Sequence, residues 1–466
     1  MGASGSPLIR ELAVAPEVLR RLAARFPERY PVLFDSAAEG PLSRTTILVA
    51  EPRAALWLDS NGRLGAEGLT PRGDTFLAAL ENWWLDERLP AGGAGAGAPQ
   101  LPFSGGWAVF VSYEIGAEIE PRLRLPPSSL PWMAFALRVP CALIYERNTG
   151  RAYIVAEEGA AESMDRLQAD ALAAANSDDN RDTLTVESVV EEDPSAYLER
   201  VLRAKEYVRA GDIYQANLSR PWHLQLTREP DIAALYSRLC RANPAPFAAL
   251  AQWRGLKILS SSPERLARII GTHIDTRPIA GTRPRSGRSD KDLAEMTELA
   301  AHPKERAEHI MLIDLERNDL GRVCQPGTVL VDELMTIESY AHVHHIVSNV
   351  SGELRADVSP IAALRAVFPG GTITGCPKFR CMQIIAELEG EGRGAYTGSL
   401  GFLGRDGSMD MNILIRTLSV VGRSVEIRAG GGIVADSDPQ RELEETRAKA
   451  RGMLAAFDRV QAGALA

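Results

Sequence analysis

Two short acidic patterns could hold a divalent cation. Glu442, Glu445 and Lys449 recur at i, i+3 and i+7, so on a helix their side chains share one face. Glu305 and Glu308 repeat the i, i+3 spacing far upstream. Carboxylate oxygens are the hard ligands that Mg²⁺ takes, together with waters or substrate oxygens. One such pair alone is more often a solvated helix face, but two pairs in one chain favour a Mg²⁺ site.

The elements that must position these glutamates are two helices, expected at residues 304–314 and 442–456, the second directly after a glycine-rich turn at 429–436. Strands and helices come in runs without strict alternation, which favours an α+β fold with large antiparallel sheets. An Ala-, Asp-, Asn- and Ser-rich stretch divides the chain. We therefore expect an N-terminal lobe at 1–158, a linker at 159–192 and a second lobe at 193–456.

Bulk composition excludes several classes of protein. With 466 residues, 45% of them hydrophobic, the chain can bury a large core, and its net charge of −9 argues against a nucleic-acid surface. No apolar run approaches the roughly 18 residues of a membrane span. The N-terminus lacks the charged-then-apolar order of an export signal. Five cysteines form no CxxC pair, so we expect reduced thiols and a cytoplasmic protein.

Several ordered motifs cover the whole second lobe and resemble one family, the chorismate-converting enzymes. That family includes component I of anthranilate synthase and of aminodeoxychorismate synthase, the isochorismate synthases and the salicylate synthases. The resemblance implies a two-lobed, anthranilate-synthase component I-like fold, with large antiparallel sheets packed face to face and helices outside. The motifs are Gly211–Arg220, Ser261–Arg265, Arg277–Arg285, Asp314–Gly321, Gly371–Lys378, Ile415–Thr417 and Ala429–Ser437.

The resemblance assigns roles to the charged residues of an acidic protein that must bind a dianion. Glu308 and Glu445 would hold Mg²⁺, with Glu305 and Glu442 as further ligands or supporting groups. The metal would take the ring carboxylate of chorismate and accept negative charge as a Lewis acid. The planar fork of Arg416 would grip the other carboxylate. The groups that assist it would be Tyr396, Lys449 and the backbone N–H groups of Gly430, Gly431 and Gly432, although three such glycines can also form an ordinary tight turn.

Glu264 resembles the family's general acid, which protonates the departing C4 hydroxyl. This role requires burial to raise the pKa of the carboxyl. A salt bridge from Glu264 to Arg265 or Arg268 is the alternative. Thr282, His345 and Thr372 match positions that line the family's pocket. A zinc site at His342 to His345 is disfavoured, because neighbouring residues of an extended run point to opposite sides.

Two positions distinguish the reactions of the family. Isochorismate and salicylate synthases place a lysine that activates water where this chain has Gln215, which favours amination by ammonia. Aminodeoxychorismate synthases commonly have a nucleophilic lysine at the position of Ala280, and the alanine resembles anthranilate synthase. The Ala429–Ser437 motif resembles the aminodeoxychorismate branch instead. We therefore expect aminodeoxychorismate synthase component I, with amination that proceeds without a lysyl adduct, and anthranilate synthase component I as the alternative.

The source of ammonia must be another protein, since none of the five cysteines lies in a Gly-x-Cys-x-Gly-type turn of an amidotransferase. The expected partner is a separate glutamine amidotransferase subunit, in para-aminobenzoate and folate biosynthesis. A hypothesis of another class is a regulatory protein that binds tryptophan in its first lobe, where Ser36 matches the regulatory segment of relatives. Asp35 stands there in place of the usual glutamate, which disfavours feedback regulation.

Overall fold

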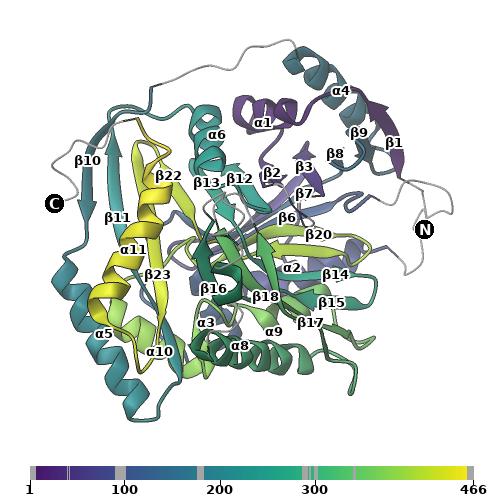
Figure 1. Ribbon diagram of the computed structural model, residues 1–466. Coiled ribbons are helices and arrows are strands. Elements are labelled where there is room, and N and C mark those ends of the chain that lie inside the picture. The colour runs from purple at the N-terminus through teal and green to yellow at the C-terminus, as the bar shows by residue number, and fades with distance from the viewer. Residues whose placement is uncertain are drawn as a thin grey trace.

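The computed structural model in Figure 1 shows two large sheets surrounded by helices. For residues 282–284, 303, 304 and 343 only the backbone is described. His342 lies outside the described residues. The structure describes residues 7–38, 40, 42, 44–89, 101–175, 183–285, 292, 295–298, 303–339 and 343–458.

Both sheets are antiparallel at every pairing of described strands. The first sheet has the order β1 (Leu8–Leu12), β9 (Arg151–Ala156), β8 (Cys141–Glu146), β3 (Thr45–Ala50), β2 (Val32–Asp35), β12 (Phe247–Trp253), β13 (Leu256–Ser262), β22 (Thr417–Val421), β23 (Ser424–Ile433), β11 (Gln215–Leu226) and β10 (Val186–Glu191), with β19 (Gly375–Cys376) beside β11. The second has the order β16 (Ile279–Pro284), β18 (Val343–Glu353), β15 (His273–Thr276), β14 (Arg265–Ile270), β21 (Met409–Asn412), β20 (Ser399–Gly404), β6 (Gly106–Val111), β7 (Trp132–Val139), β4 (Ala54–Asp59) and β5 (Leu64–Glu67), with β17 (Leu330–Ser339) beside β18.

The period of two along the strands places one core between the sheets and one on each outer face. In β3, Ile47 and Val49 belong to the central core, whereas Leu48 faces the helices outside the first sheet. In β6, Phe110 joins the same central core and Val109 faces the opposite way. Successive side chains of a strand point to opposite faces, so strands that are apolar on both faces must lie between two layers.

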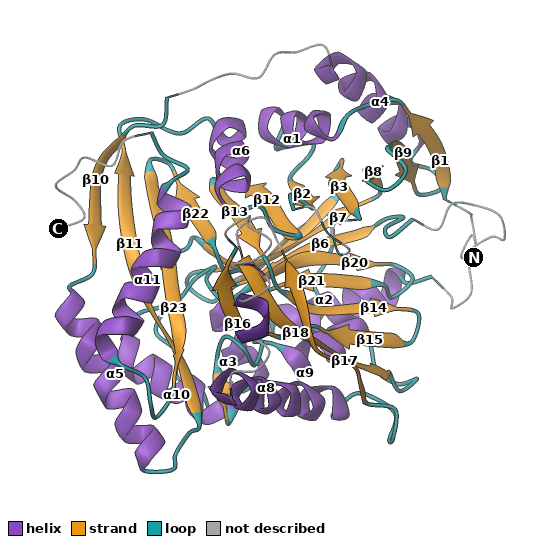
Figure 2. Cartoon of the chain, in the orientation of Figure 1, coloured by secondary structure: helices purple, strands orange, loops and turns teal. Residues whose placement is uncertain are grey.

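Helices cover the outer faces of the sheets, as Figure 2 shows. On the first sheet lie α1 (Pro16–Arg25), α4 (Ala161–Ala175), α6 (Ile232–Ala242) and α11 (Pro439–Leu454), and beside its β11 end lie α5 (Pro194–Arg209) and α10 (Lys378–Glu389). On the second lie α2 (Phe76–Glu87), α8 (Pro303–Gly321) and α9 (Pro360–Val367), and a short turn of η1 (Tyr113–Ile115) and α3 (Gly116–Ile119) follows β6. This arrangement confirms the predicted α+β class of face-to-face antiparallel sheets.

Strands from both expected lobes share both sheets. β2 pairs with β12 in the first sheet, and β6 pairs with β20 in the second. The segment 159–192 contributes α4, whose Met164 and Leu167 are buried in the core, and the edge strand β10. The chain around this segment therefore belongs to the fold as well as connecting its parts.

The sequence indicates the bounds of some helices more closely than those of others. α5 follows the local signals of its sequence, with Asp193 as its N-cap and Pro194 in its first turn. α11 begins at Pro439 after the N-cap Asp438, whose side chain accepts a hydrogen bond from the backbone of Arg441. α8 continues beyond the predicted residue 314 to Gly321. None of the described helices is long and apolar enough to cross a membrane.

Candidate functional site

The three glycines of the motif lie in strand β23, not in a turn as predicted. They stand opposite Asn217, Leu218 and Ser219 of β11. Each is closely approached by a different neighbour. A Cβ on Gly430 would lie 2.8 Å from Tyr396 Oη, and one on Gly432 would lie 1.9 Å from Gln215 Nε2. Side chains at these positions would therefore displace the groups that line the strand.

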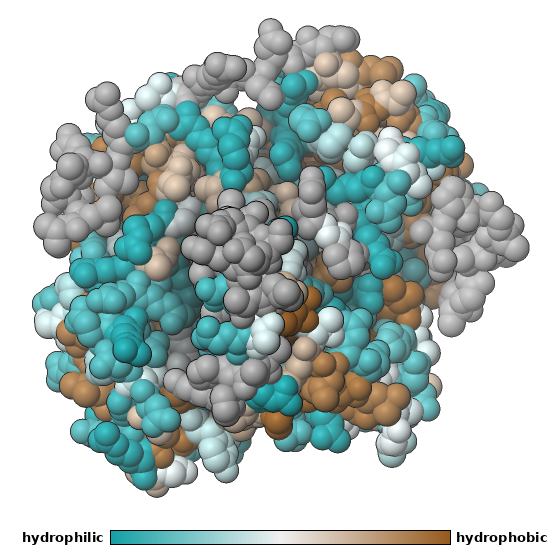
Figure 3. Space-filling model, in the orientation of Figure 1, coloured by the Kyte–Doolittle hydropathy of each residue, from teal (hydrophilic) through white to brown (hydrophobic). Residues whose placement is uncertain are grey.

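The acidic face of α11 lies above the middle glycine, as its spacing predicted. A Cβ on Gly431 would lie 3.3 Å from Glu442 Oε2, 3.8 Å from Glu445 Oε1 and 3.9 Å from Lys449 Nζ. Lys449 Nζ donates a hydrogen bond of 2.7 Å to the carbonyl oxygen of Gly430 and forms an ion pair of 2.7 Å with Glu445. The surface over α5 and α11 is mostly hydrophilic (Figure 3). The α11 pair and its lysine thus form one open, charged rim beside β23.

The second acidic pair lies on the first turns of α8, where Glu305 and Glu308 are both half-buried. Among the described residues, no group of three or more His, Cys, Asp or Glu side chains could hold a metal ion. The structure therefore brings Glu442 and Glu445 together but does not assemble all four glutamates into one cluster. Mg²⁺ usually needs only one or two carboxylates beside waters and substrate oxygens. The α11 pair fits that smaller requirement.

Glu264 is buried beside an unsatisfied hydroxyl. Its side chain is 4% exposed, and neither its Oε1 nor the Oγ1 of Thr372 has a hydrogen-bond partner in the structure. Burial raises the pKa of Glu264 to about 7; Glu316 acts in the same direction, whereas Thr372 and Arg416 act against it. Buried polar atoms are nearly always hydrogen-bonded, so two such oxygens together mark a place for a ligand.

The alternative of a salt bridge for Glu264 is wrong. Arg265 pairs with Asp410 at 3.0 Å, and Arg268 pairs with Asp275 at 2.8 Å. Both arginines are therefore committed elsewhere. The Glu264 carboxyl has the raised pKa that a general acid needs near neutral pH.

Arg416 is the cation that acts on both Glu264 and His345. Its guanidinium makes no hydrogen bond or ion pair with any other described residue. Burial lowers its pKa, and the nearby Glu264 raises it. The backbone of Arg416 has a φ of +51°, and its carbonyl oxygen accepts a 3.1 Å bond from the N–H of Ser261. A non-glycine residue held in this left-handed region is strained, and such strain is concentrated at functional sites.

Gln215 and Ala280 occupy the two positions that distinguish the family's reactions. Gln215 is buried against Gly432, its Oε1 has no hydrogen-bond partner, and its carbonyl oxygen accepts a bond from Cys381 Sγ. Ala280 lies in β16 opposite Ile346, so this strand carries a methyl group at the position where the resemblance places a lysine in aminodeoxychorismate synthases. The structure thus contains neither of the two lysines used by other family members at these positions.

His345 lies opposite Thr282 in the pairing of β16 with β18. Burial lowers the pKa of His345 to about 3, and Arg416 adds to this effect, so its imidazole is neutral. The adjacent His344 faces the other side and bonds Ser339 through Nδ1 at 2.7 Å. Neighbouring histidines therefore diverge, as expected from the alternation of a strand. For Thr282 the structure fixes the backbone position alone.

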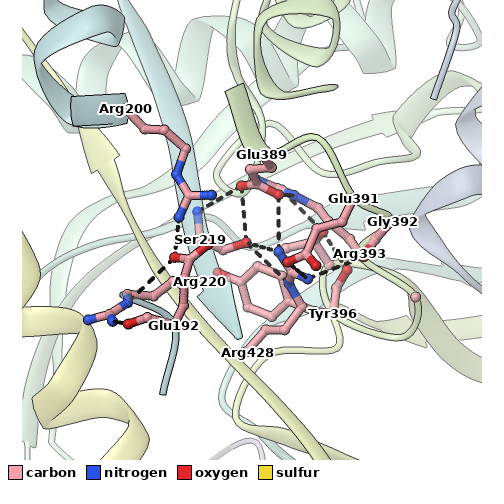
Figure 4. A network of polar contacts seen from close by, with 12 residues as sticks. Glu192, Arg200, Ser219, Arg220, Glu389, Glu391, Gly392, Arg393, Tyr396 and Arg428 are labelled. Carbon is pink, nitrogen blue, oxygen red and sulfur yellow. Dashed lines mark hydrogen bonds and ion pairs between the residues drawn. The ribbon is translucent and has the colours of Figure 1, made fainter. Parts of the chain in front are cut away.

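A buried ionic network lies beside Tyr396 (Figure 4), and the guanidinium carbon of Arg393 stands 5.6 Å from the centre of the Tyr396 ring. Glu389 pairs with Arg393 at 2.6 Å and with Arg428 at 3.4 Å, and it accepts a hydrogen bond from Ser219. Burial acts to raise the pKa of Glu389, but the two arginines hold it below its ordinary value. The network fixes β11, β23 and the Tyr396 segment relative to one another.

This network was missed by sequence reasoning. Glu389 and Arg393 have the i, i+4 spacing of a helix pair, which alone usually indicates a solvated face. Gly390 between them adopts a φ of +67° and ends α10, so Arg393 can turn back onto Glu389. The signal was the combination of the charge pair with a glycine in a helix-ending position.

Ser36 lies apart from the pocket, at the end of β2. Its hydroxyl donates to the carbonyl oxygens of Thr45 at 2.9 Å and Pro246 at 3.2 Å. The preceding Asp35 accepts hydrogen bonds from Arg20 at 2.7 Å and Thr46 at 3.0 Å. Both side chains hold neighbouring segments together, and tryptophan binding at this segment stays a prediction.

Comparisons with known proteins agree with this geometry. Residues 38–455 match the family model described as chorismate binding enzyme. The chain is 40% identical to anthranilate synthase component 1 of Streptomyces coelicolor over 85% of this chain and 80% of that protein. It is 45% identical to aminodeoxychorismate synthase component 1 of Bacillus subtilis over 56% of this chain and 55% of that protein. The crystal structure of anthranilate synthase component I from Streptococcus pneumoniae superposes with a TM-score of 0.76 and 28% identity, covering 89% of this chain and 93% of that one. A pocket with an acid, a cation and a glycine strand, in a chain that matches the family model over most of its length, shows that the protein belongs to the chorismate-binding enzymes.

Proposed function

We propose that this chain is component I of an aminodeoxychorismate synthase, which replaces the C4 hydroxyl of chorismate with an amino group from ammonia. The observation that carries the proposal is the set of buried oxygens on Glu264, Thr372 and Gln215 that have no hydrogen-bond partner among the described residues, together with the buried guanidinium of Arg416, whose charge acts on Glu264. Polar groups left open inside a fold are the ones that a polar ligand completes. Chorismate supplies two carboxylates and a hydroxyl for them.

The residues divide the chemistry between them. Protonated Glu264 gives its proton to the C4 hydroxyl, which leaves as water when its bond to carbon breaks. Ammonia forms the new bond to carbon and loses one proton, which restores the acid. Arg416 binds one carboxylate through its planar fork and fixes the ring in the pocket. Gln215 cannot serve as a base for water, and ammonia needs no such activation.

We further propose Mg²⁺ as the cofactor, held by Glu445 and Glu308 with Glu442 and Glu305 in support. When bound, the metal would act as a Lewis acid on the ring carboxylate. The α11 carboxylates stand over Gly431, and Lys449 beside them bonds the carbonyl oxygen of Gly430. That lysine places a positive charge on the same rim, which favours an incoming carboxylate.

The preference for the aminodeoxychorismate product rests on the Ala429–Ser437 motif, which forms β23 and its continuation beside the pocket. Ala280 favours the second candidate, anthranilate synthase component I, in which ammonia adds at C2 and pyruvate is later lost. Relatives with both names match this chain. Under our proposal, ammonia attacks directly, because Ala280 provides no nucleophile for a covalent adduct.

Product identification tests the proposal. The purified chain is incubated with chorismate, Mg²⁺ and an ammonium salt, and the products are separated and identified by mass and fluorescence. We expect 4-amino-4-deoxychorismate. Accumulation of anthranilate alone would establish the second candidate, and unchanged chorismate would refute both.

The partner is a separate glutamine amidotransferase that supplies ammonia. We therefore expect the isolated chain to use ammonium salts and to leave chorismate unchanged when glutamine is the sole nitrogen source. Adding a purified component II amidotransferase should restore glutamine-dependent turnover. Glutamine-dependent turnover by the chain alone would show that no partner is needed.

A further inference from the structure

A second buried carboxyl acts on Glu264 from α8. Glu316, on α8, is 5% exposed, and each of its two oxygens is used. Oε2 accepts a 2.9 Å hydrogen bond from the hydroxyl of Thr276, and Oε1 accepts a 3.3 Å bond from the backbone N–H of Gly371. One carboxyl therefore joins the end of β15 to the loop between α9 and β19.

The two segments that Glu316 joins are those that face Glu264. Thr276 leads directly into the segment containing Ile279, whose backbone N–H faces the Glu264 carboxyl, and Gly371 precedes Thr372, whose hydroxyl faces it from the other side. The space at Gly371 is closed, since a Cβ there would lie 2.5 Å from Leu315 and 3.2 Å from Glu316 Oε1. The loop is therefore seated on α8 at this one point.

Glu264 and Glu316 are connected by electrostatics as well as by the backbone segments between them. Glu316 acts to raise the pKa of Glu264. From α8 itself Asp319 faces Glu316, and from α10 Lys378 faces it, with Lys378 Nζ 2.6 Å from Asp319 and 3.0 Å from the carbonyl oxygen of Val367. The charged groups that act on Glu264 include Glu316 and, from the segment before β22, Arg416. Two like charges close together in a buried site resist ionising at the same time.

We infer that Glu316 is a positioning residue for Glu264: it ties together the two segments that face the Glu264 carboxyl, and its own carboxyl opposes loss of the Glu264 proton. This inference rests on the proposed role of Glu264 as general acid and holds whichever amination product forms. Glu316 touches no substrate in this scheme. It acts by holding the loop that carries Thr372 and through the charge of its own carboxylate.

Two substitutions separate the effects of shape and charge. Glu316→Gln keeps the length of the side chain and an oxygen for Gly371 but removes the charge. Without that charge Glu264 loses its proton more readily, so the alkaline limb of the kcat/KM profile moves to lower pH. Relative to the unsubstituted enzyme, we expect kcat/KM of Glu316→Gln to fall on the order of threefold more at pH 8 than at pH 6. Glu316→Asp keeps the charge but shortens the reach, so it should lower kcat at all pH values and leave the limb in place.

The matched control is Asp314→Asn, which removes a carboxylate from the same helix at an exposed ion pair with Arg317. It should leave the profile unchanged. A purely structural role for Glu316 predicts equal losses at every pH in both variants, and that result would overturn the inference. A shift of the limb to higher pH in Glu316→Gln would overturn it too.

A measurement without turnover keeps the test independent of the proposed function and of the folding of the Glu316 variants. Infrared titration of the carboxylic acid band in ¹³C-glutamate-labelled protein follows the buried carboxyls directly. Because coupling is reciprocal, Glu264→Gln should lower the midpoint of the remaining Glu316 band. An unmoved band would refute the coupling. Failure of the unsubstituted enzyme to convert chorismate, with the band shifted as expected, would instead refute the proposed function alone.

Discussion

Gln215 lies directly against Gly432, close enough that a methyl group on the glycine would stand 1.9 Å from Gln215 Nε2. The strand register fixes this approach, because Gly432 pairs with Asn217 and β11 continues back to Gln215. Gln215 stands where the resemblance places a water-activating lysine in isochorismate and salicylate synthases. Its side chain is thus positioned by the absence of a side chain at Gly432. Mutation of the glycine tests this relationship.

Gly432→Ala should lower kcat/KM by about 100-fold, since displacement of a positioned group by an ångström can cost that much. The chain should still fold, because the three atoms nearest to the methyl group all belong to the side chain of Gln215. Initial rates with ammonium and chorismate measure the effect, and circular dichroism checks the fold. The control is Gly321→Ala, where a Cβ would meet nothing within 4 Å. Equal activity in both variants would contradict the assigned position of Gln215.

Removing the guanidinium fork of Arg416 should weaken binding of chorismate. Arg416→Lys keeps a positive charge but loses the planar pair of donors, so we expect KM to rise about tenfold or more. Arg416→Gln should be worse, because it leaves the carboxylate without a charge. Equilibrium binding of chorismate to the Glu264→Gln background separates binding from chemistry. The control is Arg355→Gln, at a half-buried arginine that pairs with Asp357. An unchanged KM in Arg416→Lys would show that the fork does not contact substrate.

Glu264 should impose a pH dependence on activity. As a general acid it works in its protonated form, so kcat/KM should fall as pH rises above about 7. Glu264→Gln should lose about 10²- to 10⁴-fold in rate and lose this limb. A rate that stays constant from pH 6 to 9 in the unsubstituted enzyme would exclude this residue as the acid.

The same carboxyl should make stability depend on pH in the same direction, with the protonated form favoured. Its pKa in the folded chain, about 7, lies above the ordinary value of 4.5, so the folded state binds the proton more tightly. Stability is therefore full below pH 4.5 and declines as pH rises toward 7, by about 3 kcal/mol from this group. Glu264→Gln should remove that part of the decline. Denaturant unfolding at pH 5 and pH 8 measures it, and parallel curves for the two proteins would contradict the raised pKa.

The α11 carboxylates should determine the response to metal. Glu445→Gln and Glu442→Gln should each raise the Mg²⁺ concentration needed for half-maximal activity, by about 10-fold or more. Chelation with EDTA should abolish turnover, and Mg²⁺ should restore it. Glu444→Gln, an exposed residue of the same helix, is the control. Full activity after chelation would refute the metal.

Tryptophan titration tests the regulatory hypothesis. The hydroxyl of Ser36 is already committed to two carbonyl oxygens, and Asp35 to arginine and threonine partners. We therefore expect no saturable increase in melting temperature with tryptophan, while Ser36→Ala lowers the melting temperature by a few degrees through the lost hydrogen bonds. A large saturable increase would favour a retained amino-acid pocket.

Local sequence patterns predict an element well when the residues that determine it lie within that element. The bounds of α5 follow from its cap, its proline and its amphipathic period. The convergence of Glu442, Glu445 and Lys449 follows from helix geometry alone. These features depend on residues within a few turns of one another, which a sequence displays directly.

The errors arose where distant segments decide the structure. The glycine-rich motif was predicted as a turn, yet pairing with β11 extends it as a strand. α8 was ended too early because Asn318, Asp319 and Gly321 are weak helix formers. Burial of Glu316 against Thr276 and Gly371 continues the helix there. Whether α8 and α11 jointly bind one ion depends likewise on how two remote helices are placed, which no local pattern encodes.

The pairing of β2 with β12 and of β6 with β20 has a mechanical consequence. Enzymes that bind substrates between two lobes often close by rotating one lobe about a hinge, which requires few connections across the divide. Here backbone hydrogen bonds of two continuous sheets cross it. Rotation would break those ladders, so admission of substrate and release of product must rely on side chains and connecting segments at the rim while the sheets stay rigid.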